Sequence, residues 1–218
     1  MTAAALLRRS RDGASGSDHL AASGGRRFYD AAAAAWMIKI FPGEFHIVDS
    51  PDEFLFTVLG SCVAACIRDR RTGIGGMNHF MLPEGRTDGW DDPQSARYGN
   101  FAMEKLINEL LKRGCAREHM EVKVFGGGNV IDNTTRIGTQ NAEFVLRYLE
   151  AEGLTCNVRD LGGPYPRRIH YFPSSGRVAR RFLGATDLGT VVRDESAYAS
   201  RLTAKPLAGE IQLFGDDE

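Results

Sequence analysis

Hydrophobic residues along this chain gather in short runs that have the length of β-strands and are separated by turn residues. Pro42-Gly43, Asp69–Gly73 and Ser174–Gly176 have the composition of turns. The predicted strands lie at about Met37–Phe41, Glu44–Val48, Phe54–Leu59, Cys62–Ile67, Ile74–Leu82, Val122–Phe125, Cys156–Arg159, Arg168–Phe172 and Val178–Leu183. Where a short glycine-containing turn joins two runs, as between Cys62–Ile67 and Ile74–Leu82, the pattern predicts a hairpin.

Two longer segments carry apolar residues with the period of an amphipathic helix. In Ala96–Arg113 the apolar stripe recurs every four residues and ends at Gly114. In Thr139–Glu152 one face is apolar, and Gly153 follows the end of the segment. Because strand follows strand more often than strands alternate with helices, the pattern favours an α/β (α+β) fold, a mixed β-sandwich flanked by helices.

The pattern also divides the chain into a folded domain and two ends. Residues 1–34 combine small and polar residues with an alanine run, which predicts a largely mobile tail. The folded domain is expected at residues 35–186. Residues 187–218 are more polar and are expected to form a C-terminal extension, in which Ile211–Phe214 is a candidate docked strand.

Composition narrows the class of protein. The 218 residues include 27 basic and 28 acidic side chains, and this balance predicts no binding to nucleic acid or to an anionic membrane. No apolar stretch reaches ~18 residues, so no membrane-spanning helix is expected. The apolar run Ala3–Leu7 precedes Arg8 and Arg9, the reverse of the order in a signal peptide. The four cysteines form no CxxC pair, which is typical of free thiols in a reducing compartment and predicts a cytoplasmic protein.

Cys62 and His79 face each other in the predicted hairpin. A turn centred between Arg70 and Gly73 opposes residues whose numbers sum to about 141 to 143, and Cys62 and His79 sum to 141. Both side chains are therefore expected on one face of the sheet, close enough for a contact between thiol and imidazole.

The small residues around Cys62 suit a nucleophile. They leave room for a substrate carbonyl and free the backbone N–H groups of Ser61–Val63 to stabilise an oxyanion. A neighbouring histidine also lowers the pKa of a thiol, and the thiolate is the attacking species. The alternative is a buried core cysteine, and spacing alone favours that alternative because cysteine and histidine also pair by chance.

Several sequence runs add a family resemblance to this pattern. They are LGSCVAACIRD (Leu59–Asp69), GIGGMNHFMLP (Gly73–Pro83), ARYGNFAMEKLINELLKRGC (Ala96–Cys115), VKVFGGGNV (Val122–Val130), IGTQNAEFV (Ile137–Val145), DLGGPYPRRIHYFPSSGRV (Asp160–Val178) and GEIQLF (Gly209–Phe214). Together they closely resemble the CheD family of chemoreceptor glutamine deamidases, over almost everything from about residue 40 onward. The resemblance implies a fold like the catalytic domain of the cytotoxic necrotizing factor toxins.

The resemblance implies catalytic roles for particular residues. By position, the family's nucleophile falls on Cys62 and its base on His79, with oxyanion donors expected at Ser61 and Val63. The third catalytic residue is a threonine that orients the histidine, and Thr57 is the only threonine in the preceding strand. In some relatives this threonine lies one position earlier, where this chain has Phe56.

The implied reaction hydrolyses the side-chain amide of receptor glutamines to glutamate, with release of ammonia through a cysteine thioester. It needs no cofactor and no metal. The implied substrate is the cytoplasmic helical domain of methyl-accepting chemoreceptors, and in some bacteria the family also binds a CheC-type phosphatase. Two alternatives stay open: a chemotaxis adaptor without activity, and a receptor methylesterase, which differs only in its leaving group.

Other residues with chemical potential are assigned to the core or to turns. Cys66 lies four residues after Cys62, where a redox pair or a metal site is conceivable, but too few ligands converge. Gly126–Asn129 lacks the full spacing of a phosphate-binding loop and is expected to be a tight turn beside the active site. His170 is expected in the core, and Asn78 on the face opposite His79.

Overall fold

The computed structural model describes residues 26–82, 93–130 and 136–204. The strands are β1 (Arg26–Asp30), β2 (Ala35–Lys39), β3 (Phe45–Val48), β4 (Glu53–Leu59), β5 (Val63–Asp69), β6 (Gly75–Asn78), β7 (Met120–Gly126), β8 (Cys156–Leu161), β9 (Arg167–Phe172) and β10 (Arg177–Phe182). The helices are α1 (Pro93–Lys112), α2 (Ile137–Ala151) and α3 (Ala185–Ala204), with a single 3₁₀ turn at Arg117–His119.

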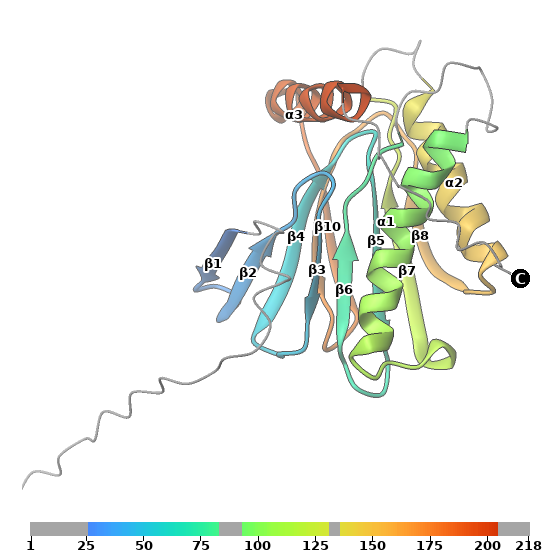
Figure 1. Cartoon of the computed structure of the whole chain (residues 1–218). Helices are drawn as coiled ribbons and strands as arrows, with labels where there is room; N and C mark the ends of the chain where they lie inside the picture. The colour runs from blue at the N-terminus through green and yellow to red at the C-terminus, as the bar shows by residue number, and fades with distance from the viewer. Residues whose placement is uncertain (1–25, 83–92, 131–135, 205–218) are drawn as a thin grey trace, which may run out of the picture.

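The strands form two five-stranded sheets that face each other (Figure 1). One sheet has the order β1-β2-β4-β9-β10 and the other β3-β6-β5-β7-β8. Each sheet is mixed, because β2 runs parallel to β4 and β7 runs parallel to β8 while the other pairs are antiparallel. The parallel pair β7–β8 is joined through α2, as a parallel connection requires. The predicted mixed sandwich with flanking helices is confirmed.

Strand β5 explains how the layers stack. It is buried on both faces, which is why its sequence is apolar without alternation. Val63, Ala65 and Ile67 pack toward α1 and α2, in a core that includes Leu106 and Val145. The alternate residues of β5 pack between the two sheets. The molecule is therefore built of one sheet, a second sheet and a layer of two helices.

Most predicted elements lie where the pattern placed them. The helices predicted at Ala96–Arg113 and Thr139–Glu152 are α1 and α2, each beginning two or three residues earlier than expected. Strand β6 is shorter than its apolar run, because the Asn78 side chain and not its backbone accepts the N–H of Ala65 on β5. Pairing with β5 resumes at Phe80, which exchanges hydrogen bonds with Val63. The turn predicted at Ser174–Gly176 joins β9 to β10.

Both ends of the folded domain differ from expectation. The tail predicted through residue 34 contains β1, which pairs with β2 through a turn in which the Asp30 carboxylate accepts hydrogen bonds from the N–H groups of Ala32 and Ala33. The extension predicted from residue 187 contains most of α3. The β1–β2 hairpin spans the predicted boundary at residue 34, and α3 spans the one at residue 186. Residues 1–25 and the candidate strand Ile211–Phe214 lie outside the described residues.

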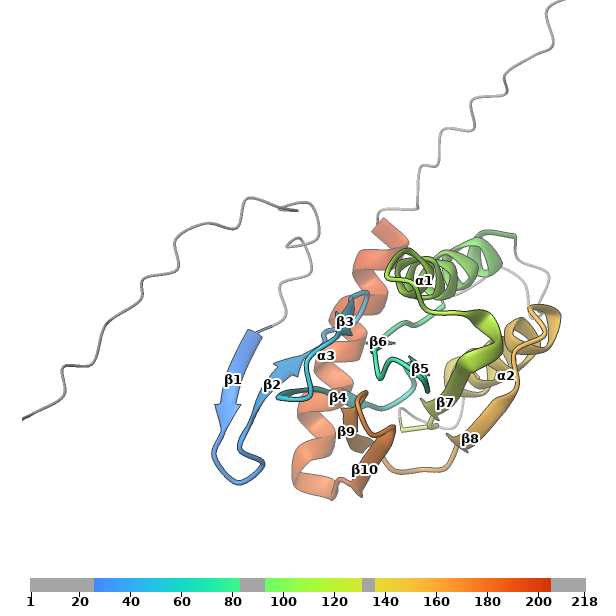
Figure 2. The same cartoon turned by 90° about the horizontal axis from the view of Figure 1, so that it is seen from below.

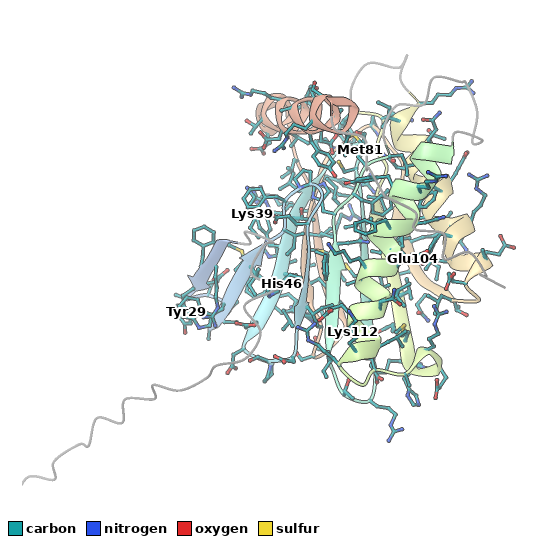
Figure 3. All side chains as sticks on the ribbon, viewed as in Figure 1. Tyr29, Lys39, His46, Met81, Glu104 and Lys112 are labelled. Atoms are coloured by element: carbon teal, nitrogen blue, oxygen red, sulfur yellow. The ribbon has the colours of Figure 1, made fainter. Side chains whose placement is uncertain are left out.

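Helix α3 lies across one end of the sandwich, over the ends of both sheets (Figures 1 and 2). Val191, Glu195 and Tyr198 are its buried residues among those described, and their spacing places them on one face of the helix. Figure 3 shows Met81 close beneath α3, whereas Lys112 lies toward the opposite end. Within the described ranges, no helix is long and apolar enough to cross a membrane.

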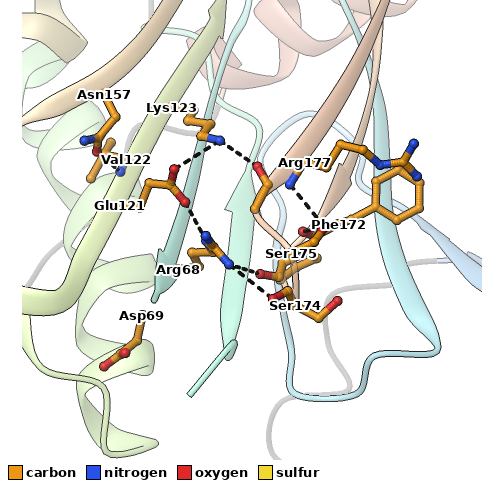
Figure 4. A network of polar contacts seen from close by, with 12 residues as sticks. Arg68, Asp69, Glu121, Val122, Lys123, Asn157, Phe172, Ser174, Ser175 and Arg177 are labelled. Atoms are coloured by element: carbon orange, nitrogen blue, oxygen red, sulfur yellow. Dashed lines mark hydrogen bonds and ion pairs between the residues drawn. The ribbon is translucent and has the colours of Figure 1, made fainter. Parts of the chain in front are cut away.

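The opposite end of the sandwich is joined by charged side chains (Figure 4). Arg68 of β5 bonds to Glu121 of β7 and donates to the carbonyl of Ser174 in the β9–β10 turn, at 3.1 Å. Lys123 of β7 pairs with the same glutamate and donates to the carbonyl of Gly176, at 2.6 Å. These contacts tie the two sheets together at the end far from α3.

Candidate active site

The loop Gly60–Cys62, between β4 and β5, has all three of its carbonyl groups held from one side. The N–H groups of Gly128 and Gly127 donate to the carbonyls of Gly60 and Cys62, each at 2.7 Å. The buried side-chain amide of Asn141, on α2, donates to the carbonyl of Ser61 at 2.9 Å. Asn141 also accepts the N–H of Leu82. With the carbonyls fixed in this way, the three N–H groups of the loop point to the opposite side.

These three N–H groups converge on one carboxylate, that of Glu195 on α3. The Gly60 and Cys62 N–H groups donate to its Oε1 at 2.8 and 3.0 Å. The Ser61 N–H and hydroxyl donate to its Oε2 at 2.8 and 2.7 Å. Successive N–H groups that face one point form an anion-binding concavity. The loop is therefore preorganised to hold a negatively charged oxygen next to Cys62.

Two glycines allow this close packing. Gly126 has φ of 109°, and a Cβ at this position would overlap the carbonyl oxygen of Cys62. Gly60 has an ordinary backbone conformation, but a Cβ there would lie 2.8 Å from the Glu195 carboxylate. A side chain at either position would push the loop away from its partners.

Thr57 determines which nitrogen of His79 carries the proton. Its hydroxyl donates to the carbonyl of Ile40 at 2.8 Å, so its oxygen accepts from Nδ1–H of His79, also at 2.8 Å. This assigns the proton to Nδ1 and leaves Nε2 with a free lone pair. Nε2 is buried and has no hydrogen-bond partner within the described part of the chain. Phe56, the neighbouring candidate, lies against His170 instead.

The structure brings Cys62 and His79 together, as the hairpin pattern predicts. The pairs Cys66–Met77 and Val63–Phe80 both sum to 143, which sets Cys62 diagonally across from His79. The Cys62 sulfur, an imidazole nitrogen of His79 and a Glu195 carboxylate oxygen all lie within 4.8 Å of one another. This spacing also suits a metal ion, although both Glu195 oxygens already accept hydrogen bonds from the loop.

Burial and Glu195 keep the site uncharged apart from the carboxylate. Burial raises the pKa of the Cys62 thiol well above its ordinary value, and the negative charge of Glu195 raises it further. Burial lowers the pKa of His79 to about 4, against the opposing effect of Glu195. At neutral pH the arrangement therefore holds a protonated thiol beside a neutral imidazole.

A cavity of about 230 Å³ reaches this site between α3 and the inner strands β2, β4 and β9 of the first sheet. Thr57, His79 and Glu195 form its inner wall, and Lys39, Arg168 and Asp194 contribute charged side chains. His79 thus borders a space that a side chain of another molecule can enter, whereas the fully buried Cys62 does not line it.

The sequence-predicted oxyanion donors are only partly placed as expected. Ser61 lies in the N–H cluster. The expectation for Val63 is wrong, because its N–H donates to the carbonyl of Phe80 within the sheet. The donors beside Ser61 are Gly60 and Cys62. Sequence reasoning also missed Asn141, whose polar side chain on the apolar face of a predicted helix was the available signal, and Glu195, which had none.

The remaining candidates, except His170, occupy the places expected of them. Cys66 is fully buried between the sheets, and Asn78 lies on the helix side, where it accepts the N–H of Ala65. The expectation of a core position is wrong for His170, which is half-buried beside Phe54 and Phe56, because alternate residues of β9 point away from the space between the sheets. Gly126–Asn129 forms the turn that contacts the Cys62 loop.

A thiol, a neutral imidazole with a fixed tautomer and a cluster of backbone N–H donors together have the geometry of a cysteine hydrolase that works by acyl transfer. Comparison with known proteins agrees with that class. The family described as CheD chemotactic sensory transduction matches residues 81–182. A protein of Rhodopseudomonas palustris (strain BisA53), named as a probable chemoreceptor glutamine deamidase CheD, is 53% identical over 87% of this chain and 89% of its own length.

Two further relatives carry the same name. The protein of Halorhodospira halophila is 48% identical over 86% of this chain and 89% of its own length, and that of Methylobacillus flagellatus is 48% identical over 86% and 94%. This chain therefore belongs to the CheD family. A solved structure, the Bacillus licheniformis hypothetical protein YfiH, overlaps 54% of this chain and 49% of its own, at 12% identity and a TM-score of 0.35, which is too little to carry an argument.

Proposed function

We propose that this chain is a cytoplasmic chemoreceptor glutamine deamidase in which Cys62 is the nucleophile and His79 the general base. One observation carries the proposal: the loop that presents the Cys62 thiol also directs three N–H groups at the two oxygens of one carboxylate, beside a histidine whose free nitrogen is buried. The names of the relatives support the substrate class, since each is called a probable chemoreceptor glutamine deamidase.

The first half of the reaction forms a thioester. Nε2 of His79 takes the thiol proton, and the Cys62 sulfur attacks the carboxamide carbon of a receptor glutamine. The carbonyl oxygen becomes an oxyanion, which the N–H groups of Gly60, Ser61 and Cys62 stabilise. The C–N bond breaks, His79 returns its proton to the leaving nitrogen, and ammonia departs.

The second half regenerates the enzyme. Water attacks the thioester while Nε2 of His79 takes one of its protons. The C–S bond breaks, the proton returns to the sulfur, and a glutamate side chain leaves. Thr57 holds Nδ1–H of His79 throughout, so the imidazole keeps the orientation and tautomer that both halves need. The product adds a negative charge to a receptor helix and so alters charge repulsion along its surface.

A CheC-type phosphatase is a further expected partner.

The test uses a purified cytoplasmic receptor fragment whose modification sites carry glutamine. Wild type is expected to release ammonia and to convert glutamine to glutamate, as mass spectrometry of the fragment would show. Cys62→Ala and His79→Ala are expected to bind the fragment without converting it. If wild type binds the fragment and leaves every glutamine intact, the adaptor function replaces the deamidase. If it acts on glutamyl methyl esters alone, the protein is a methylesterase.

A matched pair of variants tests the role of Thr57. Thr57→Val removes the hydroxyl that accepts Nδ1–H and is expected to lower kcat about 100-fold, as for the loss of an oriented base. Thr57→Ser keeps the hydroxyl and is expected to stay close to wild type. Equal kcat values for the valine and serine variants would exclude an orienting role, provided that thermal unfolding shows both to be folded.

A further inference from the structure

The Glu195 carboxylate occupies the place that the proposed reaction reserves for substrate oxygen. It accepts four hydrogen bonds from the Cys62 loop, and its partners are the same N–H groups that would stabilise an oxyanion. A hydrogen-bonded carboxylate in this site is what the reaction leaves behind at the end of a cycle, because the product is a glutamate side chain. Like that product, Glu195 is presented by a helix.

The attachment of α3 suits a segment that can leave. In a helix of 20 residues, the buried side chains among those described are Val191, Glu195 and Tyr198. Tyr198 lies against Gly43, where a Cβ would come within 2.8 Å of the tyrosine hydroxyl, and that hydroxyl bonds to Tyr98 of α1. The cavity beside Val191 and Asp194 leaves part of the helix unpacked. Besides these three buried side chains, the partly buried Ala199 and Leu202 pack against the core. So few anchors around a cavity bury little surface for a helix of this length, and another helix can compete for the same place.

We propose that α3 is a built-in product mimic: it lies in the docking site of the receptor helix, with Glu195 in the subsite of the substrate side chain, and it must move aside before deamidation. The proposal rests on the proposed function, since it identifies the competing partner as a helix that carries glutamine. With α3 docked, the Cys62 loop is occupied and the thiol is shielded. Without it, the same N–H groups are free for a substrate oxyanion.

The electrostatics of the docked state agree with an inhibited enzyme. The Glu195 charge adds to burial in raising the pKa of the Cys62 thiol, which disfavours the attacking thiolate. Tyr98 also faces the site from α1, and Tyr198 and Lys39 flank it. The removal of the Glu195 carboxylate is therefore expected to make Cys62 more reactive as well as more accessible.

The first experiment turns the mimic into a substrate. Glu195→Gln places a carboxamide in the subsite, and if that subsite is the catalytic one, Cys62 should convert the introduced amide back to glutamate, with ammonia released once per chain. Mass spectrometry of the peptide that spans position 195 would detect the change. Cys62→Ala/Glu195→Gln is the matched control and should keep the amide. A Glu195→Gln protein that converts the receptor fragment but keeps its own introduced amide overturns the proposal.

The second experiment measures inhibition directly. Glu195→Ala is expected to deamidate the receptor fragment about tenfold faster than wild type, within the usual range of coupling between competing states. Glu150→Ala removes the same charge from an exposed position on α2 that does not line the cavity, and it should behave like wild type. A Glu195→Ala rate equal to or below the wild-type rate overturns the proposal, because Glu195 would then be neutral or required for turnover.

A readout without receptor separates this proposal from the proposed function. Alkylation of Cys62 by iodoacetamide, followed on its own peptide, should be about tenfold faster in Glu195→Ala than in wild type, with Cys156 as internal reference. Faster alkylation without any receptor conversion would reject the deamidase and keep α3 as a cover over the thiol. Equal alkylation rates of Cys62 in Glu195→Ala and wild type, together with conversion of the receptor fragment, would keep the deamidase and reject α3 as a cover over the thiol.

Discussion

Two carboxylates at opposite ends of β5 bind backbone N–H groups in the same way and serve different purposes. Asp69, the last residue of β5, accepts from the N–H groups of Arg71 and Thr72 at 2.7 and 3.2 Å and from that of Ala116 at 3.0 Å. Glu195 accepts three N–H groups of the loop that precedes β5. The first carboxylate belongs to the turn that it stabilises, whereas the second reaches its donors from 134 residues away.

The difference lies in what else holds each carboxylate in place. Asp69 cannot leave its donors without unfolding its own turn, and the ion pairs of Glu121 with Arg68 and Lys123 close the same end of the sandwich (Figure 4). Glu195 is carried by a helix with few buried side chains. A cluster of N–H groups thus stabilises local structure where the carboxylate that it binds is close by in the chain. It is an exchangeable binding site where that carboxylate comes from a separate element.

The largest expected effect concerns the loop behind Glu195. Asn141→Ala removes the donor to the Ser61 carbonyl and the acceptor of the Leu82 N–H, so the N–H groups of the loop lose their orientation. We expect kcat on the receptor fragment to fall about 100-fold, as for the loss of an oxyanion donor. The control is Asn129→Ala, an exposed asparagine nearby, with near-normal kcat. Full activity in a folded Asn141→Ala protein would show that the loop keeps its geometry without this support.

The second prediction weakens the other carboxylate. Asp69→Asn keeps one oxygen for the N–H groups of the turn but replaces the oxygen that accepts the Ala116 N–H by an amide NH₂ group. The loss of that acceptor is expected to cost about 2 kcal/mol of unfolding free energy. The melting temperature should fall by roughly 4 to 8 °C with kcat unchanged. Burial raises the pKa of Asp69, but the donors Ala116, Arg71 and Thr72 outweigh it and hold the pKa below its ordinary value.

The sign of the pH dependence follows from that lowered pKa. The folded state favours the carboxylate, so its stabilisation is complete above the unfolded pKa and is lost as pH falls through the folded pKa. Wild type and Asp69→Asn should therefore differ most near neutral pH and converge in acid, below the ordinary value of 3.8. If Asp69→Asn lost as much activity as Asn141→Ala, the carboxylate at the Asp69 end of β5 would no longer be distinguished from that at the Cys62 end as purely structural.

The smallest effect is expected at Glu121. Burial raises its pKa, but hydrogen bonds from Arg68 and Lys123 outweigh burial and keep the pKa below its ordinary value of 4.5. Glu121→Gln should lose about 1 kcal/mol of unfolding free energy at neutral pH, less at high salt. Because the pKa of Glu121 is lowered like that of Asp69, the difference in unfolding free energy between wild type and Glu121→Gln should vanish in acid. Exposed Glu118→Gln is the control, and denaturant unfolding at several pH values gives the measurement. An unchanged stability would mean that Asp69 and packing close this end without the ion pairs.

The sequence pattern predicted the elements whose apolar residues are many and regularly spaced. Helices α1 and α2 and the strands of the central hairpin follow from period and turn chemistry, because their faces pack over their whole length. The proximity of Cys62 and His79 follows from the register of one hairpin, a local property of the chain. Strand β1 was missed because it is short and its side chains, including Phe28 and Tyr29, stay exposed, so pairing with β2 leaves no alternation in the pattern.

What the sequence determined by itself is the sandwich, its family and the proximity of Cys62 and His79, since each depends on local periodicity or on contiguous motifs. The tertiary structure alone decided where the N–H groups of the Cys62 loop point and what occupies them. The direction of those groups depends on carbonyl partners more than 60 residues away at Gly127, Gly128 and Asn141. The occupant is Glu195, a single glutamate on a mostly exposed helix, and only packing against the end of the sandwich distinguishes it from the other acidic residues of that helix.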